Sequence, residues 1–121
     1  MSQAREVLGI ILQIIISGLA VILAAYILPG ISVEDFFTGI VIAALLALLN
    51  ITIKPVLIFL TIPITLVTLG LFLLVINALM VIIAAEIVPG FVVEGFLWAV
   101  LFSLILSIIN SLLSVTFKSR E

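Results

Sequence analysis

Reactive side chains are scarce in this chain of 121 residues, which has no cysteine and no histidine. Without cysteine it cannot form a disulfide, an iron–sulfur site or a thiolate nucleophile. It also has no nucleophile paired with a base, no phosphate-binding glycine loop and no pair of carboxylates at catalytic spacing. The sequence therefore predicts that the protein is not an enzyme and that it holds no metal or cofactor.

Charged residues are also rare, at 8% of the chain, whereas apolar residues make up 67%. Soluble domains carry about 25% charged residues, and a chain of this length could not bury so much apolar surface by itself. Apolar runs of eighteen or more residues recur, which is typical of helices that cross a bilayer. We therefore predict an integral membrane protein in contact with lipid. Its net charge of −2 argues against nucleic-acid binding.

The chain contains an internal repeat with a shift of sixty residues. Residues 16–50 align with residues 76–110 without a gap, and fourteen of these thirty-five positions are identical. Each copy holds an apolar run, a Pro-Gly break and a second apolar run that ends in asparagine. Such self-similarity is informative about architecture. It predicts an all-α, four-helix membrane protein built from two tandem, parallel helical hairpins within one domain, residues 1–121.

Proline and glycine set the expected limits of the helices, because proline lacks a backbone donor and glycine tolerates left-handed backbone. Repeat 1 is expected at about residues 7–53 and repeat 2 at about residues 66–117. The four helices within them are expected at Val7–Leu28, Phe36–Ile53, Leu66–Val88 and Gly95–Phe117. Residues 54–65 are expected to form a short interfacial helix or a re-entrant segment, and a re-entrant segment would need close partners to cover it.

Basic residues indicate the orientation in the membrane. Four spanning helices would place all of them on one side, and they are Arg5, Lys54, Lys118 and Arg120. The positive-inside rule then predicts that both termini and the central linker are cytoplasmic. Several aromatic residues are expected to form a belt at the opposite boundary: Tyr26, Phe36, Phe37, Phe91, Phe96 and Trp98.

Small and polar residues form matching stripes on the second helix of each hairpin. Their spacing of i, i+4, i+8 and i+11 places each set on one helical face. The sets are Gly39, Ala43, Ala47 and Asn50 in the first copy, and Ala99, Ser103, Ser107 and Asn110 in the second. Small residues four apart allow helices to approach closely in lipid. Two interpretations remain open: the faces pack against other helices, within or between subunits, or they line a water-filled path.

Other polar residues lie within the apolar runs, namely Gln13, Ser17, Asn77 and Glu86. Amides must find partners away from lipid, and neutral amides favour assembly or contact with a polar ligand over acid–base chemistry. Glu86 is expected either to reach the headgroups or to serve an ion or proton path. Lys54 is expected to reach anionic lipid headgroups.

Several motifs in the chain resemble those of a known family. They are Asn50-x3-Lys54-Pro55, Leu60-Thr61-x-Pro63-x-Thr65, Thr68-Leu69-Gly70-x-Phe72-x3-Ile76-Asn77 and Pro89-Gly90-Phe91. They are similar to motifs of the small bacterial four-helix membrane proteins called phage holin superfamily IV, or the YvlD-like family. The resemblance implies a location in the bacterial inner (plasma) membrane, and the family name implies hole formation.

Three functions are therefore open at the level of sequence. The first is a structural or regulatory membrane protein that forms homo-oligomers or docks with another membrane protein. The second is a holin-like pore or small channel, and the third is a lipid or small-molecule transporter built on parallel repeats. The stripes of small residues and the missing catalytic chemistry favour the first.

Overall fold

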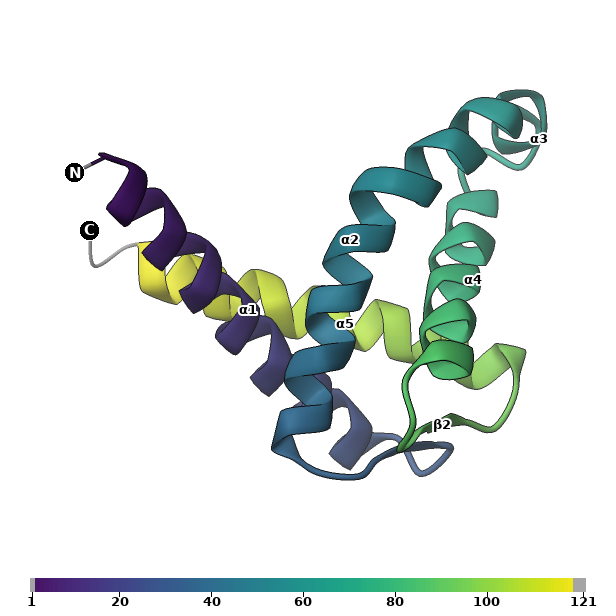
Figure 1. The fold of residues 1–121 in the computed structure, drawn as a ribbon. Helices are drawn as coiled ribbons and strands as arrows, with labels where there is room; N and C mark the ends of the chain where they lie inside the picture. The colour runs from purple at the N-terminus through teal and green to yellow at the C-terminus, as the bar shows by residue number, and fades with distance from the viewer. Residues whose placement is uncertain (1, 119–121) are drawn as a thin grey trace.

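The computed structural model describes residues 2–118, and most of them are helical, as predicted (Figure 1). The elements in chain order are α1 (Ser2–Ile27), β1 (Ile31–Val33), α2 (Phe36–Leu60), α3 (Ile62–Val67), α4 (Phe72–Ile87), β2 (Phe91–Val93) and α5 (Phe96–Lys118). The helices α1, α2 and α5 are long and apolar enough to cross a bilayer. Helix α4 is equally apolar but has 16 residues, which gives a length of about 24 Å.

The two Pro-Gly corners lie side by side and form a small antiparallel sheet that the sequence did not predict. Strand β1 pairs with β2, with Ser32 opposite Val92 at the centre. Next to the strands, the N–H of Glu34 donates to the carbonyl of Gly90 over 2.9 Å. The N–H of Glu94 donates to the carbonyl of Gly30 over the same distance. Strands of three residues are too short to show the alternation by which strands are predicted.

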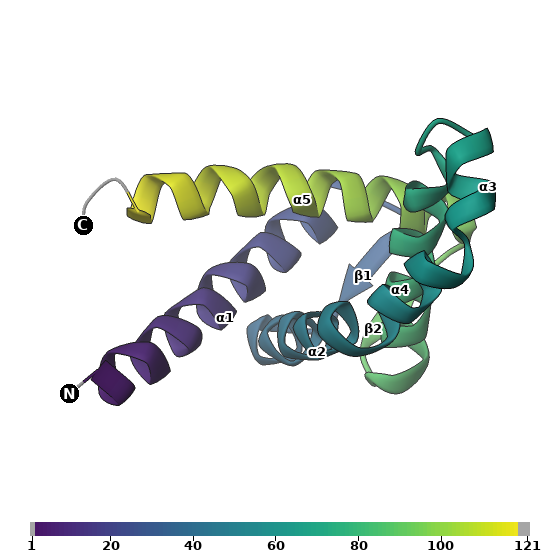
Figure 2. The ribbon, with the colours of Figure 1, turned by 90° about the horizontal axis from the view of Figure 1, so that it is seen from above.

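The helices pack in the ring order α1, α2, α4, α5, so that each touches two neighbours extensively. With distance from the strands they separate into two pairs, α1 with α5 and α2 with α4, which diverge from each other (Figures 1 and 2). The largest fully buried side chains are Val21, Ile42, Ile76, Met80 and Phe102. Diverging helices leave space between the pairs, and that space holds the candidate site.

Helices α1 and α2 approach each other closely at two glycines. A Cβ atom on Gly18 would lie 2.9 Å from Ile40 Cγ1 and 3.1 Å from Ile40 Cα. A Cβ atom on Gly39 would lie 2.9 Å from Ile22 Cδ1. Small residues at a crossing let helix backbones come together in lipid. Gly39 belongs to the predicted stripe of small residues, whereas the role of Gly18 was not predicted, although Ala78, sixty residues further on, is also small.

The predicted end of the second helix at Ile53 is wrong. Helix α2 continues through Pro55 and ends at Leu60. Proline deprives a helix of one backbone hydrogen bond, whereas a helix end leaves four carbonyl groups without intrahelical partners. In an apolar segment that is surrounded by lipid, continuing past the proline therefore costs less than stopping at it.

The expected separate segment at residues 54–65 also has the wrong limits. Its first half belongs to α2, and its second half enters the short helix α3. A turn follows in which Leu69 and Gly70 have positive φ angles of 57° and 90°. The next helix therefore begins at Phe72, six residues later than predicted. Glycine adopts left-handed backbone without steric cost, so Gly70 is the stronger break in this region.

The expected aromatic belt is only partly exposed. Phe91 is 3% exposed, and its ring packs against Phe102 with 5.6 Å between the centroids. The ring of Trp98 lies so close to Gly30 that a Cβ atom there would collide with it. Tyr26, in contrast, is 89% exposed. The side to which Phe91 points depends on the pairing of β1 with β2, which the sequence did not reveal.

Candidate functional site

Two adjoining cavities occupy the space between the diverging helix pairs. The first has a volume of about 210 Å³ and lies between α1, α2 and α5. The second has a volume of about 100 Å³ and lies between α2, α4 and α5. Leu46, Asn50 and Leu106 line both. We call the two cavities together the polar cleft, because eight polar side chains line them: Gln13, Ser17, Asn50, Lys54, Asn77, Ser103, Ser107 and Asn110.

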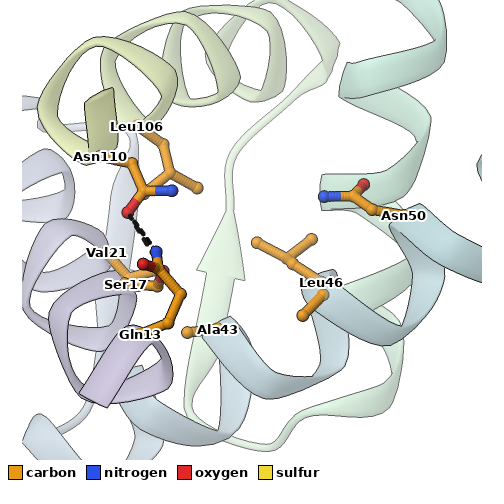
Figure 3. A pocket seen from close by; sticks show the side chains of 9 residues that line it. Gln13, Ser17, Val21, Ala43, Leu46, Asn50, Leu106 and Asn110 are labelled. Atoms are coloured by element: carbon orange, nitrogen blue, oxygen red, sulfur yellow. Dashed lines mark hydrogen bonds between the residues drawn. The ribbon is translucent and has the colours of Figure 1, made fainter. Parts of the chain in front are cut away.

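Polar side chains in the first cavity form a network that joins α1 to α5 (Figure 3). The hydroxyl of Ser17 donates to Asn110 Oδ1 over 3.1 Å. The amide nitrogen of Gln13 lies 3.2 Å from Ser17 Oγ and 3.5 Å from Asn110 Oδ1, and it donates to both. Hydrogen bonds among Gln13, Ser17 and Asn110 therefore join α1 to α5 within a single chain.

Asn50 lies on the opposite wall of the cleft, on α2, and points toward it (Figure 3). Its side chain is exposed, and it has no hydrogen-bond partner among residues 3–113, the range over which side chains are described. Asn50 is fourteen residues beyond the start of α2, about 21 Å along the helix. That distance lies inside a hydrocarbon core of about 30 Å. A polar group at this depth needs protein or water to cover it.

Burial changes along both stripes of small and polar residues. The members nearer the strands are buried, namely Gly39, Ala43, Ala99 and Ser103. Farther from the strands, Ala47, Asn50 and Ser107 are exposed. One half of each stripe therefore takes part in close packing, and the other half lines the open part of the cleft.

Apolar side chains close the cleft toward the strands. Val21, which lines the first cavity, has no exposed surface, and neither do Ile42 and Phe102. Ile76 is 1% exposed. In a single chain, therefore, the cleft ends in the packed core beneath the two Pro-Gly corners.

Lys54 brings a positive charge to the second cavity. Its side chain is half-buried and shares the cavity wall with Asn50, Asn77, Ser103 and Ser107. Among the residues that the structure describes, Lys54 makes no ion pair. None of the described acidic residues therefore compensates this charge.

The acidic residues near the strands lie apart from the cleft. Glu86 is exposed on the last turn of α4 and lines neither cavity. Asp35 caps α2 by accepting hydrogen bonds from the backbone N–H and the hydroxyl of Thr38, at 2.8 Å and 2.7 Å. These two hydrogen bonds lower the pKa of Asp35 below its usual value. Its carboxylate has a structural role at the helix start.

These features define a multi-helix integral membrane protein with a polar cleft between its helices. The family described as "Mycobacterial 4 TMS phage holin, superfamily IV" matches residues 8–112, and the chain belongs to this family. Membership confirms the resemblance that the sequence motifs predicted. The cleft residues Asn50, Lys54 and Asn77 lie within those motifs.

Two relatives give the extent of the similarity. The chain is 37% identical over 102 residues to the uncharacterised membrane protein YvlD of Bacillus subtilis (strain 168), which covers 84% of this chain and 86% of the relative. It is 42% identical over 81 residues to the uncharacterised protein SCO3922 of Streptomyces coelicolor, which covers 64% of this chain and 65% of the relative. No solved structure matches the chain.

Proposed function

We propose that this protein is a non-catalytic subunit of a membrane assembly in which a second copy covers the polar cleft. Asn50 is the observation that carries the proposal. Its exposed amide, about 21 Å along α2, has no partner among the side chains of its own chain that the structure describes. A bare amide is costly to place against lipid. A second copy would supply amide and hydroxyl groups that both donate and accept hydrogen bonds.

We also propose that each subunit consists of two parallel hairpins related by a pseudo-twofold axis along the membrane normal. The two cavities support this symmetry, because most of their lining residues correspond after a shift of sixty residues. The corresponding pairs are Ser17 and Asn77, Val21 and Val81, Ala43 and Ser103, Ala47 and Ser107, and Leu46 and Leu106. The two backbone hydrogen bonds beside the strands follow the same shift.

This symmetry leads to a proposed topology with four spans and with both termini in the cytoplasm of a bacterial cell. The paired corners support it, since they put the two Pro-Gly breaks on one side. The helix ends farther from the strands carry the basic residues Arg5, Lys54 and Lys118, as the positive-inside rule requires. The fourth basic residue, Arg120, lies outside the described residues. Helix α4 spans less than the full hydrocarbon core, so we expect the turn before it to reach the inner headgroups.

A second copy fits the cleft because the same surface would meet itself across a twofold axis. Such an isologous contact is the commonest form of assembly in oligomers. Ala47 and Ser107 are small and exposed at the cleft, so helices of two subunits could approach closely there. A different membrane protein in this position is the competing partner, and a count of subunits distinguishes the two.

The substitution Asn50→Leu tests the assembly. We expect it to weaken dimerisation by roughly 10- to 300-fold, because a twofold interface would lose two hydrogen bonds worth about 0.6–1.7 kcal/mol each. Thr52→Val is the matched control, since the Thr52 hydroxyl donates within its own helix to the Leu48 carbonyl over 2.7 Å. Photobleaching steps of single labelled particles in lipid bilayers would count the subunits. A wild-type protein that is monomeric at every protein-to-lipid ratio would contradict the proposal.

A holin-like pore or small channel is the second candidate, and the polar lining of the cleft favours it. Because the cleft is closed beneath the corners in one chain, such a pore would have to open between copies. Dye leakage from liposomes tests this function. Leakage that Asn50→Leu abolishes would favour the pore, whereas tight vesicles with an intact oligomer would favour the structural role. A lipid or small-molecule transporter would need the closed end to open, so it has less support.

A further inference from the structure

We propose that the second cavity of the polar cleft binds a phosphate-bearing anion through Lys54. Among the residues whose side chains the structure describes, the donors of this cavity without a partner are the Lys54 ammonium group, the amides of Asn50 and Asn77, and the hydroxyl of Ser107. The Ser103 hydroxyl already donates to the carbonyl of Val100 over 2.8 Å. No carboxylate from the described part of the chain lines the cavity. A cation surrounded by neutral donors and without an anion of its own matches the oxygen acceptors of a phosphate group.

The contrast between the two cavities supports this site. In the first, Gln13, Ser17 and Asn110 bind one another and so use their hydrogen-bonding groups internally. In the second, Asn77 makes no side-chain hydrogen bond among residues 3–113, whose side chains the structure describes. Lys54 breaks the repeat, since the position sixty residues later is Ser114. The cavity that holds the cation therefore also offers unused donors.

The position of Lys54 along its helix places the site at a level where phosphates occur. Lys54 lies eighteen residues beyond the start of α2, about 27 Å along the axis. A hydrocarbon core of about 30 Å ends close to this point. The phosphate of an anionic lipid in the cytoplasmic leaflet and free phosphate from the cytoplasm could both reach it. Their shared chemistry is a tetrahedral anion that accepts several hydrogen bonds.

Lipid titration followed by native mass spectrometry of the full-length protein in detergent tests the site. The probe is phosphatidylglycerol, and the variant is Lys54→Gln. We expect an affinity about fivefold lower, in keeping with the effect of one basic residue near anionic lipid. Arg5→Gln is the matched control, because it removes the same charge from an exposed position that lines neither cavity. Equal affinity of the wild type and both variants would overturn the proposal.

A second arm identifies the source of the anion. The phosphate group alone is sufficient if inorganic phosphate displaces phosphatidylglycerol from the wild type and does not bind the Lys54→Gln variant. The lipid headgroup is the ligand if inorganic phosphate does not displace phosphatidylglycerol while Lys54→Gln still weakens phosphatidylglycerol binding. If both probes bind the wild type and the Lys54→Gln variant with equal affinity, the proposed site is contradicted.

Asn77→Leu keeps the charge and removes one donor, so it tests whether the cavity wall takes part. We expect this variant to weaken phosphatidylglycerol binding as well, and unchanged binding would contradict a role for the cavity. Melting temperatures measured without ligand separate a folding defect from a binding defect. All the proposed contacts come from one chain, so the site does not rest on self-association. A monomeric protein that still shows the Lys54 dependence would support the site while contradicting the proposed assembly.

Discussion

At the scale of single residues, Gly18 sets how closely α1 approaches α2. We predict that Gly18→Ala lowers the free energy of unfolding by about 1–3 kcal/mol, because a Cβ atom would press against the backbone of Ile40. The matched control is Gly9→Ala in the same helix, where a Cβ atom meets nothing within 4 Å. Alanine favours helix over glycine, so we expect the control to be neutral or stabilising. Unfolding titrations in mixed micelles measure both, and equal stabilities would contradict this packing.

Asp35 gives a prediction about pH. Hydrogen bonds from Thr38 lower the pKa of Asp35 in the folded protein, so its charged form stabilises the fold. This contribution is complete above the ordinary pKa of an aspartate, and it is lost as the pH falls through the lowered value. Asp35→Asn still caps the helix but does not titrate. We expect the wild-type melting temperature to fall more steeply than that of the variant between neutral pH and about pH 2. Parallel curves would contradict the cap.

Residues that interrupt a long apolar run could be selected from the sequence alone. Asn50, Lys54 and Asn110 stand out in this way, and all of them line the cleft. The partners of these residues could not be predicted. Asn110 binds side chains more than ninety positions away on α1, and such contacts depend on how the helices cross. Leu46 and Leu106, which line both cavities, resemble any other apolar residue in the sequence.

At the scale of elements, the paired corners are the feature that holds the two halves of the chain together. We predict that Ser32→Cys with Val92→Cys forms a disulfide within one chain on mild oxidation. Residues directly opposite in antiparallel strands have Cα atoms about 4.5–5.5 Å apart, which suits a disulfide. The natural chain has no cysteine to interfere. The control pair is Ser32→Cys with Leu97→Cys, because Leu97 lies outside the strands and is exposed.

Mass spectrometry after alkylation measures the result of this experiment. The strand pair should lose both free thiols without forming a covalent dimer, and the control pair should keep them. Free thiols in the strand pair under the same oxidation would show that the corners are apart.

The existence of the helices could be predicted because apolar runs of this length have few alternatives in a bilayer. Their limits were harder to predict, because local rules treat every Pro or Gly alike. Pro55 lies inside α2, whereas Gly70 lies in the turn before α4. The difference is physical, since lipid penalises an early helix end more than it penalises one missing hydrogen bond. The pairing of β1 with β2 depends on residues sixty positions apart and leaves no local pattern.

At the scale of the whole molecule, the divergence of the helix pairs determines where the polar stripes can act. Helical periodicity placed each stripe on one face of its helix. Periodicity could not show that the two faces pack tightly near the strands and separate farther away. That arrangement depends on how the helices cross, which follows from packing around Gly18 and Phe102. The partly open cleft is thus a property of the folded single chain. The proposed contact with a second copy follows from this open cleft.

Cysteine cross-linking in native membranes tests the central claim, that the open cleft faces a second copy. A single cysteine at Ala47 would lie in the cleft, and a single cysteine at Leu48, 53% exposed, would lie outside it. With a short thiol cross-linker, the account predicts covalent dimers for Ala47→Cys and little dimer for Leu48→Cys. Monomeric Ala47→Cys protein together with dimers of Leu48→Cys would contradict it.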